Sequence, residues 1–208
     1  MGKGEHQMTQ HTNEAQIYDA KLSPTKDELL AEHSTITTRE GSYRALDRDD
    51  QVGIEVIVGT DAEGKRTQCG FTYRDRSIAL DDELSPLTHS ELGSRSVAPL
   101  TADPVAVREI IQLILAGGKG ADFSLGEPIF QVRGTGQLSD VNVDGVEIEE
   151  HNAYTCFGTV TLDGEENRFQ LRLQEEIKDQ HVIDDGELAL VTAGPSGDIA
   201  LIRLEVWK

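Results

Sequence analysis

This chain of 208 residues contains few of the residues on which specialised sites are commonly built. It has two cysteines and one tryptophan, and Phe, Trp and Tyr together make up 5% of it. Cys69 and Cys156 stand far apart, without a C-x-x-C motif or a paired histidine, so we predict two buried or half-buried thiols and no metal site. The low aromatic content also leaves little material for the sugar platforms of a glycosidase.

Long hydrophobic runs are absent as well. No segment approaches the ~18 consecutive apolar residues that a membrane-spanning helix needs. The first residues, M-G-K-G-E-H-Q-M-T-Q-H-T-N-E, lack the apolar core of a signal peptide. We therefore expect a cytoplasmic protein.

Basic residues are scarce relative to acidic ones. The chain has 19 Lys and Arg residues against 38 Asp and Glu residues, which gives a formal net charge of -19. Such a field repels phosphate backbones and anionic membranes, so we expect neither a nucleic acid nor a membrane surface as a partner. The carboxylates are dispersed along the chain, which favours a solvated acidic surface over a binding arm.

The N-terminal part combines a polar tail with a short strand and helix. Residues 1–15 are polar and without periodicity, which predicts a flexible tail. Residues 16–22, Q-I-Y-D-A-K-L, alternate enough for a short strand. Ser23-Pro24 then predicts an N-cap and a first helical residue. In the short helix that follows, we expect Leu29 and Leu30 to face inward.

Residues 51–60 and 66–74 predict a β-hairpin around the turn D-A-E-G-K. The first strand has one apolar face of period two. The second strand is predicted to place Cys69, Phe71 and Tyr73 on one face, with Gln68 and Arg74 nearer the other. The apolar face of the first strand consists of Val52, Ile54, Val56 and Val58.

The clearest helix in the sequence follows residue 103. Asp103 can cap it, Pro104 can begin it, and Gly117-Gly118 can end it. Its apolar residues recur at helical spacing and form a broad stripe suited to packing on a sheet. The stripe consists of Val107, Ile110, Ile111, Ile114 and Leu115.

From residue 119 the sequence changes to short strands separated by Gly, Asp and Asn. Strands are predicted within 127–137, 153–162, 167–174, 187–193 and 198–207, and turn residues between neighbours predict an antiparallel meander. In the last strand, simple alternation puts Ile199 and Leu201 on the face opposite Ile202 and Leu204. We therefore predict an α+β fold, with a curved antiparallel sheet and packed helix at 16–118 and an antiparallel β half at 119–208.

The stretch S-P-L-T-H-S-E-L-G-S-R at 85–95 crowds reactive side chains together. His89 and Ser90 point to opposite faces if the segment is a strand, and no G-x-S-x-G elbow occurs, so a Ser-His-Asp triad is not predicted. We interpret the stretch as a structured turn in which His89 donates to the backbone and Arg95 pairs with a carboxylate. The candidate binding residues are His89, Glu91, Arg95, Tyr73 and Arg74, and no catalytic or cofactor-binding residue is predicted.

Six short motifs occur in order along the first half of the chain. They are A-K-L-S-P-T-K-D-E-L-L-A at 20–31, S-Y-R at 42–44, V-G-I-E at 52–55, F-T-Y-R at 71–74, H-S-E-L-G-S-R at 89–95 and D-P-V at 103–105. Together they resemble the N-terminal cap domain of actinobacterial maltokinases and related sugar or aminosugar kinases, and its stand-alone relatives. The resemblance implies a cystatin-like curved sheet with a helix.

The resemblance also implies a role beside sugar metabolism. The sequence has no H-G-D catalytic loop and no nucleotide-binding lysine in a recognisable setting. We therefore expect a non-catalytic accessory or regulatory module, whose partner is an enzyme of the maltose, trehalose or α-glucan pathways. Two alternatives stay open: an ATP-dependent sugar phosphotransferase or carbohydrate-processing enzyme that uses His89 and Glu91, and a homo-oligomer formed through an exposed sheet edge of the second half.

Overall fold

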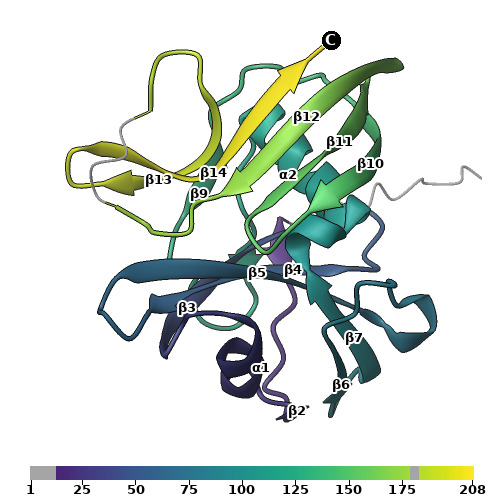
Figure 1. Ribbon diagram of the computed structural model, residues 1–208, viewed down its shortest axis with the longest axis vertical. Helices are drawn as coiled ribbons and strands as arrows, with labels where there is room; N and C mark the ends of the chain where they lie inside the picture. The colour runs from purple at the N-terminus through teal and green to yellow at the C-terminus, as the bar shows by residue number, and fades with distance from the viewer. Residues whose placement is uncertain (1–12, 179–182) are drawn as a thin grey trace, which may run out of the picture.

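The computed structural model describes residues 13–178 and 183–208, which form two six-stranded antiparallel sheets and two α-helices (Figure 1). The first sheet lies in the lower half of Figure 1 and the second in the upper half. In spatial order, the first sheet consists of β2 (Leu22–Ser23), β6 (Ser85–His89), β7 (Gly93–Pro99), β5 (Arg66–Asp75), β4 (Gly53–Thr60) and β3 (Thr38–Ala45). The second consists of β10 (Val143–His151), β11 (Thr155–Leu162), β12 (Glu165–Leu173), β14 (Gly197–Trp207), β13 (Leu188–Gly194) and β9 (Val132–Gly134). The predicted α+β class is confirmed at this level.

The first sheet is buried on both faces. The predicted apolar face of β4 packs toward the second sheet, whereas Ile57 joins a separate cluster beneath α1 (Lys26–His33). In β5, Cys69 and Phe71 belong to the cluster beneath α1. Gln68 faces the second sheet instead, where its Nε2 donates to the carbonyl of Leu201 at 2.6 Å. The predicted division of the hairpin into two faces is thus confirmed.

Helix α2 (Pro104–Ala116) lies between the two sheets (Figure 1). Its N-cap is Asp103, whose Oδ1 accepts from the backbone N–H of Val105 at 3.0 Å. It ends at Gly117, which adopts the left-handed conformation that glycine tolerates best. The five residues of the predicted stripe are all buried and share one core with both sheets. The domain boundary expected at residue 118 therefore does not separate two cores, because residues on both sides of it share one hydrophobic core.

A buried ion pair fixes α2 to the first sheet. Arg74 donates from Nε to Asp103 Oδ2 at 2.8 Å and from Nη2 to Oδ1 at 2.5 Å. Asp103 is fully buried and the Arg74 side chain is 11% exposed. The same carboxylate caps the helix, so the start of α2 and the end of β5 depend on one side chain.

The second sheet departs from the predicted meander. Strands β10 to β12 follow chain order, but β14 lies between β12 and β13. The connection over residues 174–187 is long enough to pass one strand position, and the tight β13–β14 hairpin then docks with its second strand inward. Strand β10 was not predicted because its acidic residues obscure the alternation. The strand predicted in 127–137 shrinks to β9.

A β-bulge in β14 explains an error in the predicted faces of that strand. Leu190 pairs with Ile202 and Val191 pairs with Ala200, which leaves Leu201 as an extra residue. The extra residue shifts the alternation of side chains along β14, so Leu201 and Ile202 both face the core. The core residues of β14 are Ile199, Leu201, Ile202 and Leu204.

The N-terminal predictions are corrected in part. Residues 1–12 of the predicted tail lie outside the described residues, but β1 (Glu14–Ala15) pairs in parallel with β8 (Asp122–Phe123). The strand predicted at 16–22 reduces to β2. Helix α1 begins after Thr25 rather than Ser23, because Thr25 and Glu28 form a reciprocal capping box. The inward positions predicted for two leucines are confirmed by the burial of Leu29 and Leu30.

Both cysteines are buried and free, as predicted. Burial raises the pKa of Cys69 and of Cys156 to about 12. Within the described part of the chain, no helix is long and apolar enough to cross a membrane.

Strand β10 forms an edge of the second sheet and bears on the predicted homo-oligomer. It carries exposed Glu147, Glu149 and Glu150, and its pairing with β11 contains two register shifts. Charged residues and bulges on an edge oppose the addition of another strand. The homo-oligomer stays a prediction, which sedimentation at low concentration decides.

We expect Asp103→Ala to lower the free energy of unfolding by about 3–5 kcal/mol, because it leaves the Arg74 charge buried and removes the cap of α2. Urea denaturation at pH 7 measures this loss. The matched control is Glu149→Ala, which removes an exposed pair with Arg168 and should cost far less, because water and salt screen an exposed pair. Equal losses in the two variants would contradict this account of the buried pair.

Candidate functional site

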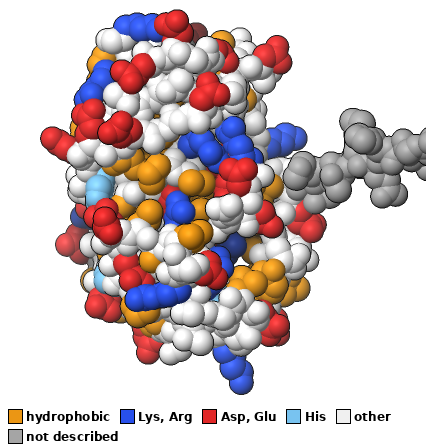
Figure 2. Space-filling view, turned by 90° about the vertical axis from the view of Figure 1, so that its right-hand side faces the viewer, with side chains coloured by type: hydrophobic (Ala, Val, Ile, Leu, Met, Phe, Trp, Pro, Cys, Tyr) orange, Lys and Arg blue, Asp and Glu red, His pale blue; other side chains and the backbone are white. Residues whose placement is uncertain are grey.

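A cavity of about 330 Å³ lies beside the first sheet and is lined by residues from both of its faces. It lies between the sheet, α1 and an extended N-terminal segment, residues 13–21, which we call the strap. Figure 2 shows a hollow in the lower part of the face that it draws, bordered by hydrophobic and Lys or Arg side chains. Apolar residues that line the cavity include Ile17, Ala20, Leu22, Leu87 and Leu92.

The strap is held at both ends by hydrogen bonds to distant residues. Near its start, the backbone N–H of Ile17 donates to Ser124 Oγ at 2.8 Å. At its end, Lys21 N donates to Ser90 Oγ at 3.0 Å, and Ser90 N donates to the Lys21 carbonyl at 3.0 Å. Ser90 of the T-H-S-E sequence is therefore an anchor for the strap that encloses the cavity. Tyr18, in the middle of the strap, packs edge-on against His89 with ring centroids 5.5 Å apart.

A buried carboxylate, Glu55, organises the polar side of the cavity. Glu55 lies on β4 with its side chain 1% exposed. Its Oε1 accepts from Lys26 Nζ at 2.7 Å and lies 3.3 Å from Arg44 Nη2. Its Oε2 accepts from the Tyr73 hydroxyl at 3.0 Å. Lys26, Arg44 and Tyr73 all line the cavity, so one carboxylate positions three of its side chains.

These contacts decide the charge of Glu55. Burial alone would raise its pKa, but Arg44 and Lys26 outweigh burial and lower the pKa to about 2. Burial, and the Glu55 carboxylate after it, raise the pKa of Tyr73 well above its ordinary value. At neutral pH the site therefore holds an ionised Glu55 and a protonated Tyr73 hydroxyl.

His89 has a defined tautomer. Its Nδ1 accepts from the backbone N–H of Glu91 at 3.2 Å and of Leu92 at 3.1 Å, which corrects the prediction that His89 donates to the backbone. The ring proton must then reside on Nε2. Burial and the nearby Arg95 lower the pKa of His89, so the ring is neutral at pH 7. His89 thus shapes the β6–β7 turn and lines the cavity as a neutral ring.

Arg95, on β7, also lines the cavity. Its Nη2 donates to the Tyr73 carbonyl at 3.3 Å, and its buried Nε has no hydrogen-bond partner. Among the described residues it forms no ion pair, so the carboxylate partner predicted for Arg95 is not observed. Lys26 and Arg44, in contrast, each pair with the Glu55 carboxylate.

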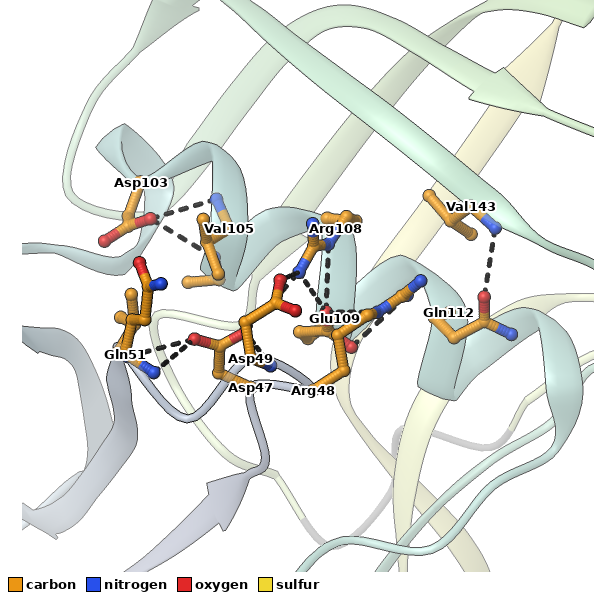
Figure 3. Close-up of polar contacts among 12 residues, drawn as sticks. Asp47, Arg48, Asp49, Gln51, Asp103, Val105, Arg108, Glu109, Gln112 and Val143 are labelled. Carbon is orange, nitrogen blue, oxygen red and sulfur yellow. Dashed lines mark hydrogen bonds and ion pairs between the residues drawn. The ribbon is translucent and has the colours of Figure 1, made fainter. Parts of the chain in front are cut away.

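The turn between β3 and β4 forms the far wall of the cavity and is tied to α2 (Figure 3). Asp47 Oδ2 accepts from the backbone N–H of Gln51 at 2.9 Å and of Val52 at 3.0 Å. Arg108 on α2 lies 3.4 Å from Asp47 Oδ1 and also contacts the neighbouring Glu109. The ion pairs of Figure 3 thus stabilise the β3–β4 turn that forms this wall. Both carboxylate oxygens of Asp47 already have partners within the protein.

The structure brings three of the five predicted binding residues together. Tyr73, His89 and Arg95 line the cavity. Arg74 points to the opposite face of the sheet, because neighbours on a strand alternate, and it pairs with Asp103. The side chain of Glu91 is exposed and lies outside the cavity lining.

Sequence analysis missed Lys26, Arg44 and Glu55. A usable signal existed for Glu55, which interrupts the apolar strand V-G-I-E-V-I-V. A carboxylate within a strand buried on both faces needs a cationic partner. The identity of its partners depends on long-range packing and could not be predicted from spacing.

The cavity carries fixed charges on Lys26, Arg44 and Arg95. In the described part of the chain, no group of three or more His, Cys, Asp or Glu residues could hold a metal ion. Comparison of the chain with protein-family models and with curated proteins finds no match.

We expect the contribution of Glu55 to stability to depend on pH. Its pKa is lower in the folded than in the unfolded chain, so its stabilisation is present above about pH 4.5 and is lost as the pH falls toward 2. Glu55→Gln should therefore cost on the order of 3 kcal/mol at pH 7 and little at pH 2.

Urea denaturation of both proteins at several pH values measures this difference. Glu149→Gln is the control, because Glu149 forms an exposed pair. Parallel pH profiles for the natural sequence and Glu55→Gln would rule out the ionised, paired state of Glu55.

Proposed function

We propose that this chain is a non-catalytic binding module that holds a small molecule in the cavity beneath the strap. The observation that carries this proposal is the cavity itself, a preformed hollow of about 330 Å³. This volume falls within the range of small-molecule pockets, which are mostly apolar and contain a few placed polar groups. Here Glu55 fixes the polar groups before any ligand arrives.

The location of the six sequence motifs supports the proposal. Five of them supply residues of the cavity or of the Glu55 contacts. In chain order these include Lys26, Arg44, Glu55, Tyr73, and the pair His89 and Arg95. The sixth motif, D-P-V, begins α2 and holds Arg74. The motifs therefore converge on the cavity and its support.

The resemblance to maltokinase caps extends the proposal to a ligand class and a partner. The curved first sheet with α1 on its outer face is compatible with a cystatin-like cap. We propose maltose, trehalose or another α-glucan sugar as the ligand, and an enzyme of the same pathways as a partner. This extension rests on the sequence motifs alone.

The geometry gives less support to the alternative of an enzyme. A general acid–base pair of His89 and Glu91 needs free, converging groups. His89 Nδ1 is engaged by two backbone N–H groups, and the Glu91 side chain is exposed outside the cavity. We therefore favour binding over catalysis, and a screen with Mg-ATP tests the phosphotransferase directly.

We expect maltose or trehalose to raise the melting temperature of the chain in a thermal-shift assay. A ligand at 100 times its Kd adds ~2.7 kcal/mol to the free energy of unfolding. Ala20→Trp, which places a large ring among the lining residues, should abolish the shift because it fills the cavity. The control is Ala62→Trp at the exposed β4–β5 turn, which should preserve the shift.

Three outcomes would change the proposal. If neither sugar shifts the natural sequence, the link to α-glucan sugars is removed. An undiminished shift in Ala20→Trp places the sugar elsewhere on the molecule. A shift with Mg-ATP would replace the binding module by the phosphotransferase alternative.

A further inference from the structure

Arg95 is the basic residue of the cavity lining that forms no ion pair among the described residues. Three basic residues line the cavity, and two of them, Lys26 and Arg44, share the Glu55 carboxylate. Arg95 donates a single hydrogen bond, at 3.3 Å, to the Tyr73 carbonyl. The guanidinium has five N–H donors, so most of its capacity is unused within the described residues.

The carboxylate that lies across the strand pair does not satisfy Arg95. Asp75 is the cross-strand partner of Arg95 between β5 and β7. Its Oδ1 accepts instead from the backbone N–H and the hydroxyl of Ser77, at 2.9 Å and 2.6 Å. Arg95 therefore senses the charge of Asp75 across the strand pair but forms no ion pair with it, although the chain has 38 acidic and 19 basic side chains. A missing partner at a cavity wall is the position that a bound anion would take.

The remaining walls define the other properties of such a ligand. Near Arg95, the neutral His89 ring adds no negative charge, and Leu87 and Leu92 are apolar. At the opposite wall, Asp47 and Asp50 carry negative charge. This distribution attracts an anionic group to the Arg95 end and repels it from the other end.

We propose that the cavity binds a small organic anion, with its carboxylate or phosphate group on Arg95 and an apolar or aromatic body against the strap. This inference rests on the proposed ligand cavity, and it names a ligand class different from the neutral sugars that the sequence motifs suggest. Arg95 acts as the residue that selects for charge, whereas Glu55, Lys26 and Arg44 form a mutually paired support that carries one net positive charge. Carboxylates and phosphates share the planar or tripodal oxygens that a guanidinium binds through two hydrogen bonds.

Isothermal titration of the full chain with three probes of similar body tests the inference. The probes are phenylacetate, phenyl phosphate and the neutral 2-phenylethanol. We expect both anions, or one of them, to bind at least about tenfold more tightly than the alcohol, since a hydrogen bond to a charged group is worth this factor or more. The stronger of the two anions identifies the preferred oxygen group.

Three variants test whether the preference for anions depends on Arg95. Arg95→Gln should bind the anions and the alcohol equally, and Arg95→Lys should retain a preference because it keeps the charge. The control is Arg168→Gln, a change of the same kind in an exposed pair on the second sheet, which should bind as the natural sequence does.

The outcomes separate this inference from the proposed function. Binding of all three probes with equal affinity would overturn the anion preference and leave the cavity as a ligand site. A preference that survives in Arg95→Gln would remove Arg95 from it. Failure of all three probes to bind would overturn the inference, while sugar binding that Ala20→Trp abolishes would still support the proposed function.

Discussion

The first sheet has an apolar cluster on each face, so the chain has to cover both of them. Its inner face is sealed by α2 and the second sheet within one core. Its outer face is six strands wide, roughly 24 Å, whereas α1 has eight residues and is about 12 Å long. The strap crosses part of the remaining area without filling it. The cavity lies beneath the strap, where residues of both faces of the sheet meet, and Ser90 and Ser124 hold the strap that encloses it.

Charge is distributed in this cavity by a single buried carboxylate. Glu55 binds two of the three cations of the walls and the Tyr73 hydroxyl, so these groups are fixed before a ligand enters. Ordering them in advance reduces the entropy that binding must overcome. Arg95 takes no part in the Glu55 contacts and forms no ion pair with any described residue. The site thus combines a rigid, mutually paired cluster with one selective cation.

Local sequence signals predicted the elements whose causes are local. Asp103, Pro104 and Gly117 defined α2, and alternation defined β4 and β5. The order of the second sheet depends on how a hairpin docks, which no local pattern contains. The bulge at Leu201 also reverses an alternation that the sequence alone suggests. In the candidate site, three predicted residues meet, but adjacency on a strand wrongly grouped Arg74 with Tyr73, and the contacts of Glu55 are long-range.

The most direct test of the central claim is to map where a ligand contacts the protein. Amide chemical shifts from heteronuclear NMR can be followed during a titration with phenylacetate. The account predicts that the changes concentrate on the strap, on the β6–β7 turn at His89 and on the adjoining ends of β4, β5 and β7. Changes centred on the second sheet, or spread evenly over the chain, would contradict the assignment of the cavity as the binding site.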